Sequence, residues 1–209
     1  MTPTQANWGR IVQIINENSL YLHSIDFWGH SDADMLEVGN GGLTYAESRS
    51  HFALWAAMKS PILIGTALDK LSQDLVTVLK NRYLLAFHQD DVYGAPAMPY
   101  KWGTNPDWTF NASFPAEYWA GASQNGTLVL MLNTAHAGAN KTATWSEVPG
   151  LDKSQSYDVL DVWTGNSLGC VADGVTAVLA SHDTASLLVQ GACGTQESGV
   201  GYKARRWTA

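Results

Sequence analysis

The chain has 209 residues, of which 45% are apolar and 15% charged, and its formal charge is −7. This composition supports a sizeable core and excludes a disordered chain, while the acidic balance argues against nucleic-acid binding. No run of about 18 apolar residues occurs, so no membrane-spanning helix is expected. The length suits one large domain or two small ones.

Three helices are expected in the first 90 residues, each marked by an N-cap signal and by apolar residues at helical spacing. They begin after Thr2, after Thr44 and after Ser72. Thr44 and Glu47 form a capping box, which predicts that the second helix starts there and continues to about Met58.

Short apolar runs between these helices are strand candidates. "ILIG", residues 62–65, is apolar up to its glycine, as expected of a strand that is buried on both faces. Residues 24–28 and 34–36 are shorter candidates, and "LLAF", residues 84–87, ends the segment. Alternating helices and strands indicate a parallel sheet. Two or three strands form only a slice of an α/β barrel or open sheet, with unpaired parallel edges.

From about residue 91 the pattern becomes all-β. Residues 94–108 are rich in Gly, Pro and aromatics and are interpreted as a linker or entry loop. Strand-like runs separated by turn residues follow at 117–120, 127–133, 142–145, 157–163, 175–180 and 186–190. They predict an antiparallel β-sandwich. Residues 194–209 are interpreted as a basic tail.

Cys170 and Cys193 flank the last expected hairpin. A disulfide between them would close a loop of roughly 24 residues and contribute about 3 kcal/mol in the chain-entropy picture; the alternative is two free buried thiols. Sequons at Asn111, Asn125 and Asn140, taken with a disulfide, favour a secreted protein. The start of the chain, "MTPTQANWGR", lacks the apolar core of a signal peptide, which suggests that a natural N-terminal part is missing.

An acidic cluster lies in "HSDADMLEVGNGG", residues 30–42. Asp32 and Asp34 would point to one side of a strand, where barrel enzymes carry catalytic groups. They could divide acid and base chemistry, or bind a divalent cation with His30. Alternatively, Asp32 caps local backbone amides and Glu37 is solvated. Spacing alone leaves these alternatives open.

Two further features bear on function. Ser181-His182-Asp183 contains the letters of a catalytic triad, but adjacent residues cannot build one, so this segment is interpreted as a hairpin loop. The chain has nine Trp, which suit either sugar stacking or a β core. An exposed cluster of Trp102, Trp108, Trp119, Trp145 and Trp163 would favour a non-catalytic carbohydrate-binding protein.

The run "FWGHSDADMLEVGNGGLTYAESRSHFALWAAMKSPILIGTALDKLS" closely resembles the fungal secreted α-galactosidases of glycoside hydrolase family 27. "LLAFHQDDVYGAPA" resembles the segment where that family leaves its barrel, and the resemblance covers about residues 2–193. It implies an α/β plus all-β fold: the C-terminal part of a (β/α)8 TIM barrel over 1–90, an antiparallel β-sandwich over 91–193, and a tail over 194–209.

The resemblance also implies retaining hydrolysis of terminal α-D-galactosides by two carboxylates, without metal or cofactor. The segments that carry the nucleophile and the acid/base would lie upstream of Met1, so no catalytic residue is assigned and the chain is expected to be inactive alone. Asp34 and Met35 match residues that bind galactose, with Asp32 and Trp28 as structural neighbours. A non-catalytic carbohydrate-binding or interaction protein, one half of a two-chain barrel and a homo-oligomer stay open as alternatives.

Overall fold

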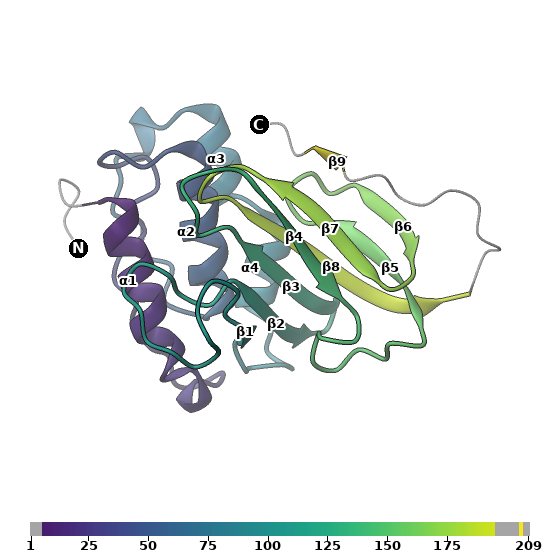
Figure 1. Cartoon of the computed structure of the whole chain (residues 1–209). Coiled ribbons are helices and arrows are strands. Elements are labelled where there is room, and N and C mark those ends of the chain that lie inside the picture. Colours follow the sequence, from purple (N-terminus) through teal and green to yellow (C-terminus); the bar gives the residue numbers. More distant parts are fainter. Residues whose placement is uncertain (1–5, 195–204, 207–209) are drawn as a thin grey trace.

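The chain forms three layers: a group of helices, a six-stranded sheet and a three-stranded sheet (Figure 1). This computed structural model describes residues 6–194 and the backbone of residues 205–206. The helices lie on one side of the six-stranded sheet, and the smaller sheet covers its other side. The predicted antiparallel β second part is confirmed, whereas the first part, predicted as alternating helices and parallel strands, consists mainly of helices.

The helical part begins with α1 (Trp8–Ser19). Its N-cap is Asn7, whose side chain accepts a hydrogen bond from the backbone N–H of Arg10 at 3.0 Å, whereas the expected cap Thr2 lies outside the described residues. The capping box of Thr44 and Glu47 is present and opens the second helix. The remaining elements are α2 (Tyr45–Ala57), α3 (Gln73–Leu79), α4 (Arg82–His88) and two 3₁₀ turns at Leu22–Ser24 and Leu68–Lys70.

The expected buried strand at 62–65 is wrong. The structure has only a single parallel bridge between Leu36 and Ile64. Leu63 is 52% exposed and Ile64 is 43% exposed. Within the described residues no further strand pairs with either of these segments, so apolar side chains that a larger parallel sheet would cover face solvent. The run at 84–87 is part of helix α4, because the Asn81 side chain caps that helix by accepting from the backbone N–H groups of Tyr83 and Leu84.

The β part forms two sheets, antiparallel except for the pair of β7 and β9. All six strand-like runs predicted from the sequence contain strands. The structure adds β1 inside the expected linker, β6, and the two-residue β9 inside the expected tail. The larger sheet has the order β1-β2-β3-β8-β5-β6 and the smaller one β4-β7-β9, in which β9 runs parallel to β7. The strands are β1 (Met98–Lys101), β2 (Tyr118–Ser123), β3 (Gly126–Leu132), β4 (Ala139–Thr144), β5 (Ser156–Asp161), β6 (Ser167–Val171), β7 (Gly174–Leu179), β8 (Thr184–Cys193) and β9 (Arg205–Arg206).

Strand β3 is buried on both of its faces. Leu128 and Leu130 pack into the core shared with the helices, whereas Val129 and Met131 pack into the core between the two sheets. Successive side chains of a strand point to opposite faces, so the continuous apolar run of β3 serves both layers. The six-stranded sheet is therefore the middle layer, and the helices and the sandwich share it.

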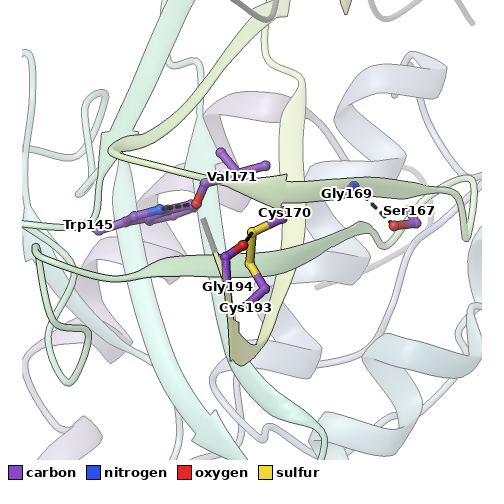
Figure 2. The surroundings of a disulfide bond; sticks show 7 residues. All are labelled: Trp145, Ser167, Gly169, Cys170, Val171, Cys193 and Gly194. Carbon is purple, nitrogen blue, oxygen red and sulfur yellow. Dashed lines mark hydrogen bonds between the residues drawn. A yellow bond between two sulfur atoms is a disulfide. The ribbon is translucent and has the colours of Figure 1, made fainter. Parts of the chain in front are cut away.

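A disulfide joins Cys170 on β6 to Cys193 at the end of β8, and their Cα atoms are 5.9 Å apart (Figure 2). The expected last hairpin is wrong, because β7 and β8 lie in different sheets. Close by, the indole N–H of Trp145 donates to the carbonyl of Val171 at 3.0 Å, and this Trp is fully buried. The disulfide is thus present as predicted, and neither cysteine is a free thiol.

Candidate functional site

A polar cavity of about 290 Å³ lies between α1 and the loop that contains the acidic cluster. This volume is at the lower end of the range of small-molecule sites. Three carboxylates and one guanidinium line it, so its charge is negative and it suits a neutral ligand with hydroxyl donors better than an anion. The lining residues are Arg10, Ile14, Glu17, Asn18, Asp32, Ala33 and Asp34.

Asp34 has a left-handed backbone conformation, with φ of 73°. Its backbone N–H donates to Oδ1 of Asp32 at 2.8 Å, and its own Oδ1 accepts from the backbone N–H of Met35 at 2.8 Å. A left-handed non-glycine residue costs about 1–2 kcal/mol, and such residues cluster at functional sites. Asp32 thus forms the turn that places Asp34 at the cavity.

Helix α2 and the segment that follows it hold this loop in place. The indole N–H of Trp55 on α2 donates to the carbonyl oxygen of Asp34 at 2.8 Å. The backbone N–H of Ala33 donates to Oγ of Ser60 at 2.8 Å. Trp55 and Ala33 are almost completely buried, so these two hydrogen bonds are shielded from water. The strained Asp34 backbone is therefore fixed from the protein side.

Glu37 is fully buried, so the alternative in which it is solvated is wrong. Its backbone N–H donates to Nε2 of His51 at 2.9 Å, and its Oε2 accepts from the side chain of Asn40 at 2.5 Å. Burial lowers the pKa of His51 to about 3, so this ring is neutral and able to accept. Glu37 and His51 therefore support the acidic loop from behind and do not enter the cavity.

Of the other residues expected near the site, Met35 lies beside Asp34, whereas Trp28 lies outside the cavity. Met35 is half-buried next to Asp34, and a Cβ added at Gly65 would lie 3.3 Å from the Cβ of Met35. Trp28 is 87% exposed, meets Phe27 edge-on with ring centroids 4.8 Å apart, and does not line the cavity. Within residues 6–194 no three His, Cys, Asp or Glu side chains are arranged to hold a metal ion.

The contribution of α1 was missed by the sequence analysis. Arg10, Glu17 and Asn18 face the cavity from this helix, and Asn18 Oδ1 accepts from the hydroxyl of Ser31 in the acidic loop at 2.5 Å. The available signal was the polar face of an amphipathic helix, which is usually solvated. Only the tertiary arrangement places that face against residues 31–34.

The tryptophans do not form the exposed cluster that a sugar-binding sandwich would need. Trp102, Trp119 and Trp145 are at most 1% exposed, and Trp163 is partly buried in the core shared with the helices. Trp108 alone of these five is exposed, at 62%. Most of these tryptophans are therefore part of the hydrophobic core.

The described part of the chain contains no helix that is both long and apolar enough to cross a membrane.

Two family models match consecutive segments of the chain. The model described as alpha galactosidase A matches residues 4–90, and the model described as alpha galactosidase C-terminal beta sandwich domain matches residues 113–189. Together they cover the helical part and most of the β part.

Curated relatives with the name probable alpha-galactosidase B extend this match. The protein from Talaromyces emersonii is 60% identical over 196 residues, which cover 90% of this chain and 43% of the relative. One from Aspergillus fumigatus is 57% identical, with 90% of this chain and 46% of the relative covered. The chain thus spans less than half the length of these relatives.

Solved structures agree with the fold. Alpha-galactosidase I from Mortierella vinacea has a TM-score of 0.73 and 29% identity, and the match covers 84% of this chain and 43% of that one. The Saccharomyces cerevisiae α-galactosidase solved with raffinose has a TM-score of 0.71, 20% identity, and coverage of 85% and 50%. The predicted fold class, part of a barrel followed by a β-sandwich, is confirmed. With both family models, the relatives and these structures in agreement, the chain belongs to the α-galactosidases of glycoside hydrolase family 27 and corresponds to their C-terminal part.

Proposed function

We propose that this chain supplies one wall of the galactose pocket in a retaining α-galactosidase that hydrolyses terminal α-D-galactosides. The observation that carries the proposal is the strained Asp34 at a polar cavity, held by Asp32 and Trp55. Strain maintained by several buried contacts at a cavity is typical of a binding or catalytic site. The relatives named α-galactosidase and the yeast structure with raffinose support a galactoside as the ligand.

Each residue of the acidic loop has a distinct role in this proposal. Asp34 accepts a hydrogen bond from a galactose hydroxyl, and Met35 packs against the sugar ring. Asp32 is a positioning residue, because its Oδ1 holds the backbone N–H of Asp34. Trp28 lies outside the cavity and shapes the start of the loop through its contact with Phe27.

The nucleophile and the acid/base are proposed to come from polypeptide equivalent to the N-terminal part of the relatives. Retaining hydrolysis needs two carboxyl groups about 5–5.5 Å apart across the glycosidic bond. The local bonds of Asp32 and Asp34 favour loop formation instead of that arrangement. The segments at Leu36 and Ile64 pair with each other through one parallel bridge, and the side chain of Leu63 is exposed, which fits further parallel strands on either side of this pair.

Hydrolysis of an aryl α-galactoside tests this function. The purified 209-residue chain is expected to give no release above background. Co-expression with the unmatched N-terminal segment of the Talaromyces emersonii relative is expected to give activity, and Asp34→Asn in that complex should reduce it at least 100-fold. Turnover by the isolated chain that is lost in Asp34→Asn would instead make Asp32 and Asp34 the catalytic pair.

A secreted, disulfide-bonded glycoprotein is the proposed setting. The disulfide supports it, because disulfides persist in oxidising compartments. The exposed Asn125 and Asn140 and the partly exposed Asn111 support it as well. A non-catalytic carbohydrate-binding role has less support, since three of the five tryptophans that it would use are fully buried. Titration of the isolated chain with galactose, followed by its Trp fluorescence, tests that alternative directly.

A further inference from the structure

The loop between β1 and β2 displays two large aromatic side chains to solvent. Trp108 is 62% exposed and Phe110 is 54% exposed. They lie three residues and one residue before Asn111, the first residue of the sequon Asn111-Ala112-Ser113. Exposed apolar rings of this size are costly to leave in water, so their position directly before a modification motif calls for a physical reason.

The loop is held in one conformation, so the rings are presented in a fixed way. The backbone N–H of Trp102 donates to Oδ1 of Asp107 at 2.8 Å, and the side-chain amide of Asn105 donates to the carbonyl of Phe114 at 2.6 Å. Trp108 itself has a left-handed backbone with φ of 61°. A bulky residue adopts that conformation only where its surroundings enforce it.

One side of the Trp108 ring is supported by the protein. The buried ring of Trp102 lies behind it, with ring centroids 4.8 Å apart and planes inclined at 45°. Because Trp108 remains 62% exposed, much of its surface is open outward. The indole is therefore a backed, outward-facing surface of the kind on which a sugar ring stacks.

The Asn111 side chain is partly exposed and makes few strong hydrogen bonds. Its Oδ1 accepts from the backbone N–H of Ser113 at 2.9 Å, while its Nδ2 has a long hydrogen bond of 3.5 Å to Asn105. The backbone N–H of Phe114 donates to the carbonyl of Asn111 at 3.1 Å, which closes a turn with Asn111 as its first residue. A substituent on Nδ2 therefore displaces little and emerges from a turn next to the two aromatic rings.

We propose that Asn111 carries an N-linked glycan and that its first N-acetylglucosamine stacks on the indole of Trp108, with Phe110 at its edge. In the modification, Nδ2 of Asn111 bonds to the anomeric carbon of a lipid-diphosphate-linked oligosaccharide. The carbon–oxygen bond to the diphosphate breaks, the diphosphate leaves with the bonding electrons, and the amide proton is released. The glycan then covers an apolar surface that the protein leaves uncovered.

Covalent attachment makes this contact effective. A sugar tethered to Asn111 has a high effective concentration at Trp108, so even a weak stacking contact is populated. The other sequons differ in this respect. Asn125 lies in the turn between β2 and β3 after Ala122-Ser123-Gln124, and Asn140 lies on β4 after Ala137-Gly138-Ala139, so no aromatic residue precedes either one closely. The Asn125 site is therefore a control within the same chain.

The test uses the chain secreted from a yeast host, with glycopeptide mass spectrometry to measure occupancy of each sequon. Trp108 is followed by acrylamide quenching in a Trp28→Phe background, because Trp28 is the other strongly exposed tryptophan among the described residues. Trimming each glycan to its first N-acetylglucosamine should leave the quenching and the melting temperature unchanged. Complete removal from Asn111 should increase quenching and lower the melting temperature by about 2–4 °C.

Three variants distinguish stabilisation by stacking of the glycan on Trp108 from any effect of glycan attachment alone. Trp108→Ala should abolish the stabilisation that the Asn111 glycan confers, Trp108→Phe should retain part of it, and Asn125→Gln should leave it unchanged. An unmodified Asn111, or a glycan effect that is equal in Trp108→Ala and the parent chain, would overturn the proposal. If Trp108→Ala fails to fold, unchanged quenching of the parent chain after glycan removal overturns it as well. None of these readouts depends on α-galactosidase activity, so the result stands apart from the function proposed above.

Discussion

Glu47 on α2 and His182 just before β8 are joined by a contact of 2.7 Å between Oε1 and Nδ1, although 135 positions separate them in the chain. Both side chains are about nine-tenths buried. Oε2 of the same carboxylate accepts from the backbone N–H of Thr44 at 2.8 Å, and Trp8 of α1 stacks on the His182 ring with centroids 4.6 Å apart. A single carboxylate thus caps a helix and ties the helical layer to the sandwich.

This contact predicts energetic coupling between the two layers. A double-mutant cycle of Glu47→Ala and His182→Ala, measured by urea unfolding, should give a coupling free energy of about 1–3 kcal/mol, because the pair is buried and hydrogen-bonded. The ion pair between Lys101 and Glu147, 2.9 Å apart and over a third exposed, is the control. Its cycle should give less than about 1 kcal/mol. Equal coupling free energies in the two cycles would show that burial does not strengthen the contact between Glu47 and His182.

The chain should lose stability as the pH falls from neutrality. His51 is fully buried, and burial lowers its pKa from 6.5 to about 3. Between these values the unfolded chain binds more protons than the folded one, so the free energy of unfolding decreases as the pH decreases, by at most about 1.4 kcal/mol per pH unit. Burial also lowers the pKa of His88, which acts in the same direction.

The range from pH 6.5 to 5 lies between the ordinary pKa of a histidine and the lowered pKa of His51, so it is the range for this measurement. Burial raises the pKa of Asp161 and of Asp183, so their contribution to the free energy of unfolding decreases as the pH rises, which opposes the effect of His51. His51→Gln keeps an acceptor for the backbone N–H of Glu37 and should flatten the dependence. The same substitution at the exposed His23 should leave it unchanged. If His51→Gln does not alter the pH dependence of the free energy of unfolding, this dependence does not come from His51.

Removing the disulfide should cost about 3 kcal/mol, because it closes a loop across a sequence separation of 23. The double variant Cys170→Ser/Cys193→Ser, unfolded with urea, measures the loss. Cys170 is exposed and Cys193 is half-buried, so little packing is lost with the sulfurs. Reducing agent should destabilise the parent chain by a similar amount and leave the double variant unaffected. An effect of the reductant on the double variant would point to another cause.

Replacement by alanine should affect stability very differently at two neighbouring glycines, Gly41 and Gly42. Gly41 has a φ of 61°, and a Cβ there would lie 2.2 Å from the carbonyl oxygen of Ala6. Gly41→Ala should therefore destabilise the chain by more than about 1 kcal/mol, through both the backbone conformation and the clash. At Gly42 a Cβ meets no atom within 4 Å, so Gly42→Ala should be close to neutral. Thermal unfolding of the two variants side by side provides the comparison.

Local signals in the sequence predicted many of the elements. The capping box of Thr44 and Glu47 specifies the start of α2 through contacts three residues apart, and alternation with turn residues identified strands of both sheets. Strand β1 was missed because Pro99 and the surrounding Gly-rich sequence indicate a loop, while pairing with β2 decides its conformation. Exposure of Leu63 and Ile64 likewise depends on which strands lie beside them, which local sequence does not encode.

The candidate site was predictable only in part. Spacing drew attention to Asp32 and Asp34, and their roles followed only from the family resemblance. The burial of Glu37 depends on His51, fourteen positions away on another element. In the sequence, the face of α1 that reaches the cavity has the pattern of an ordinary solvated helix face. Long-range packing, more than residue type, therefore decided which polar residues became part of the site.

Because β3 has one row of side chains in each core, the helical and β parts cannot behave as interchangeable modules. A cut near residue 90 would uncover Leu128 and Leu130 on one product and the apolar side of α2 on the other. Both products would then be prone to aggregate. The chain should accordingly unfold in a single cooperative transition, and grafting this sandwich onto an unrelated protein would require a helical layer to be transplanted with it.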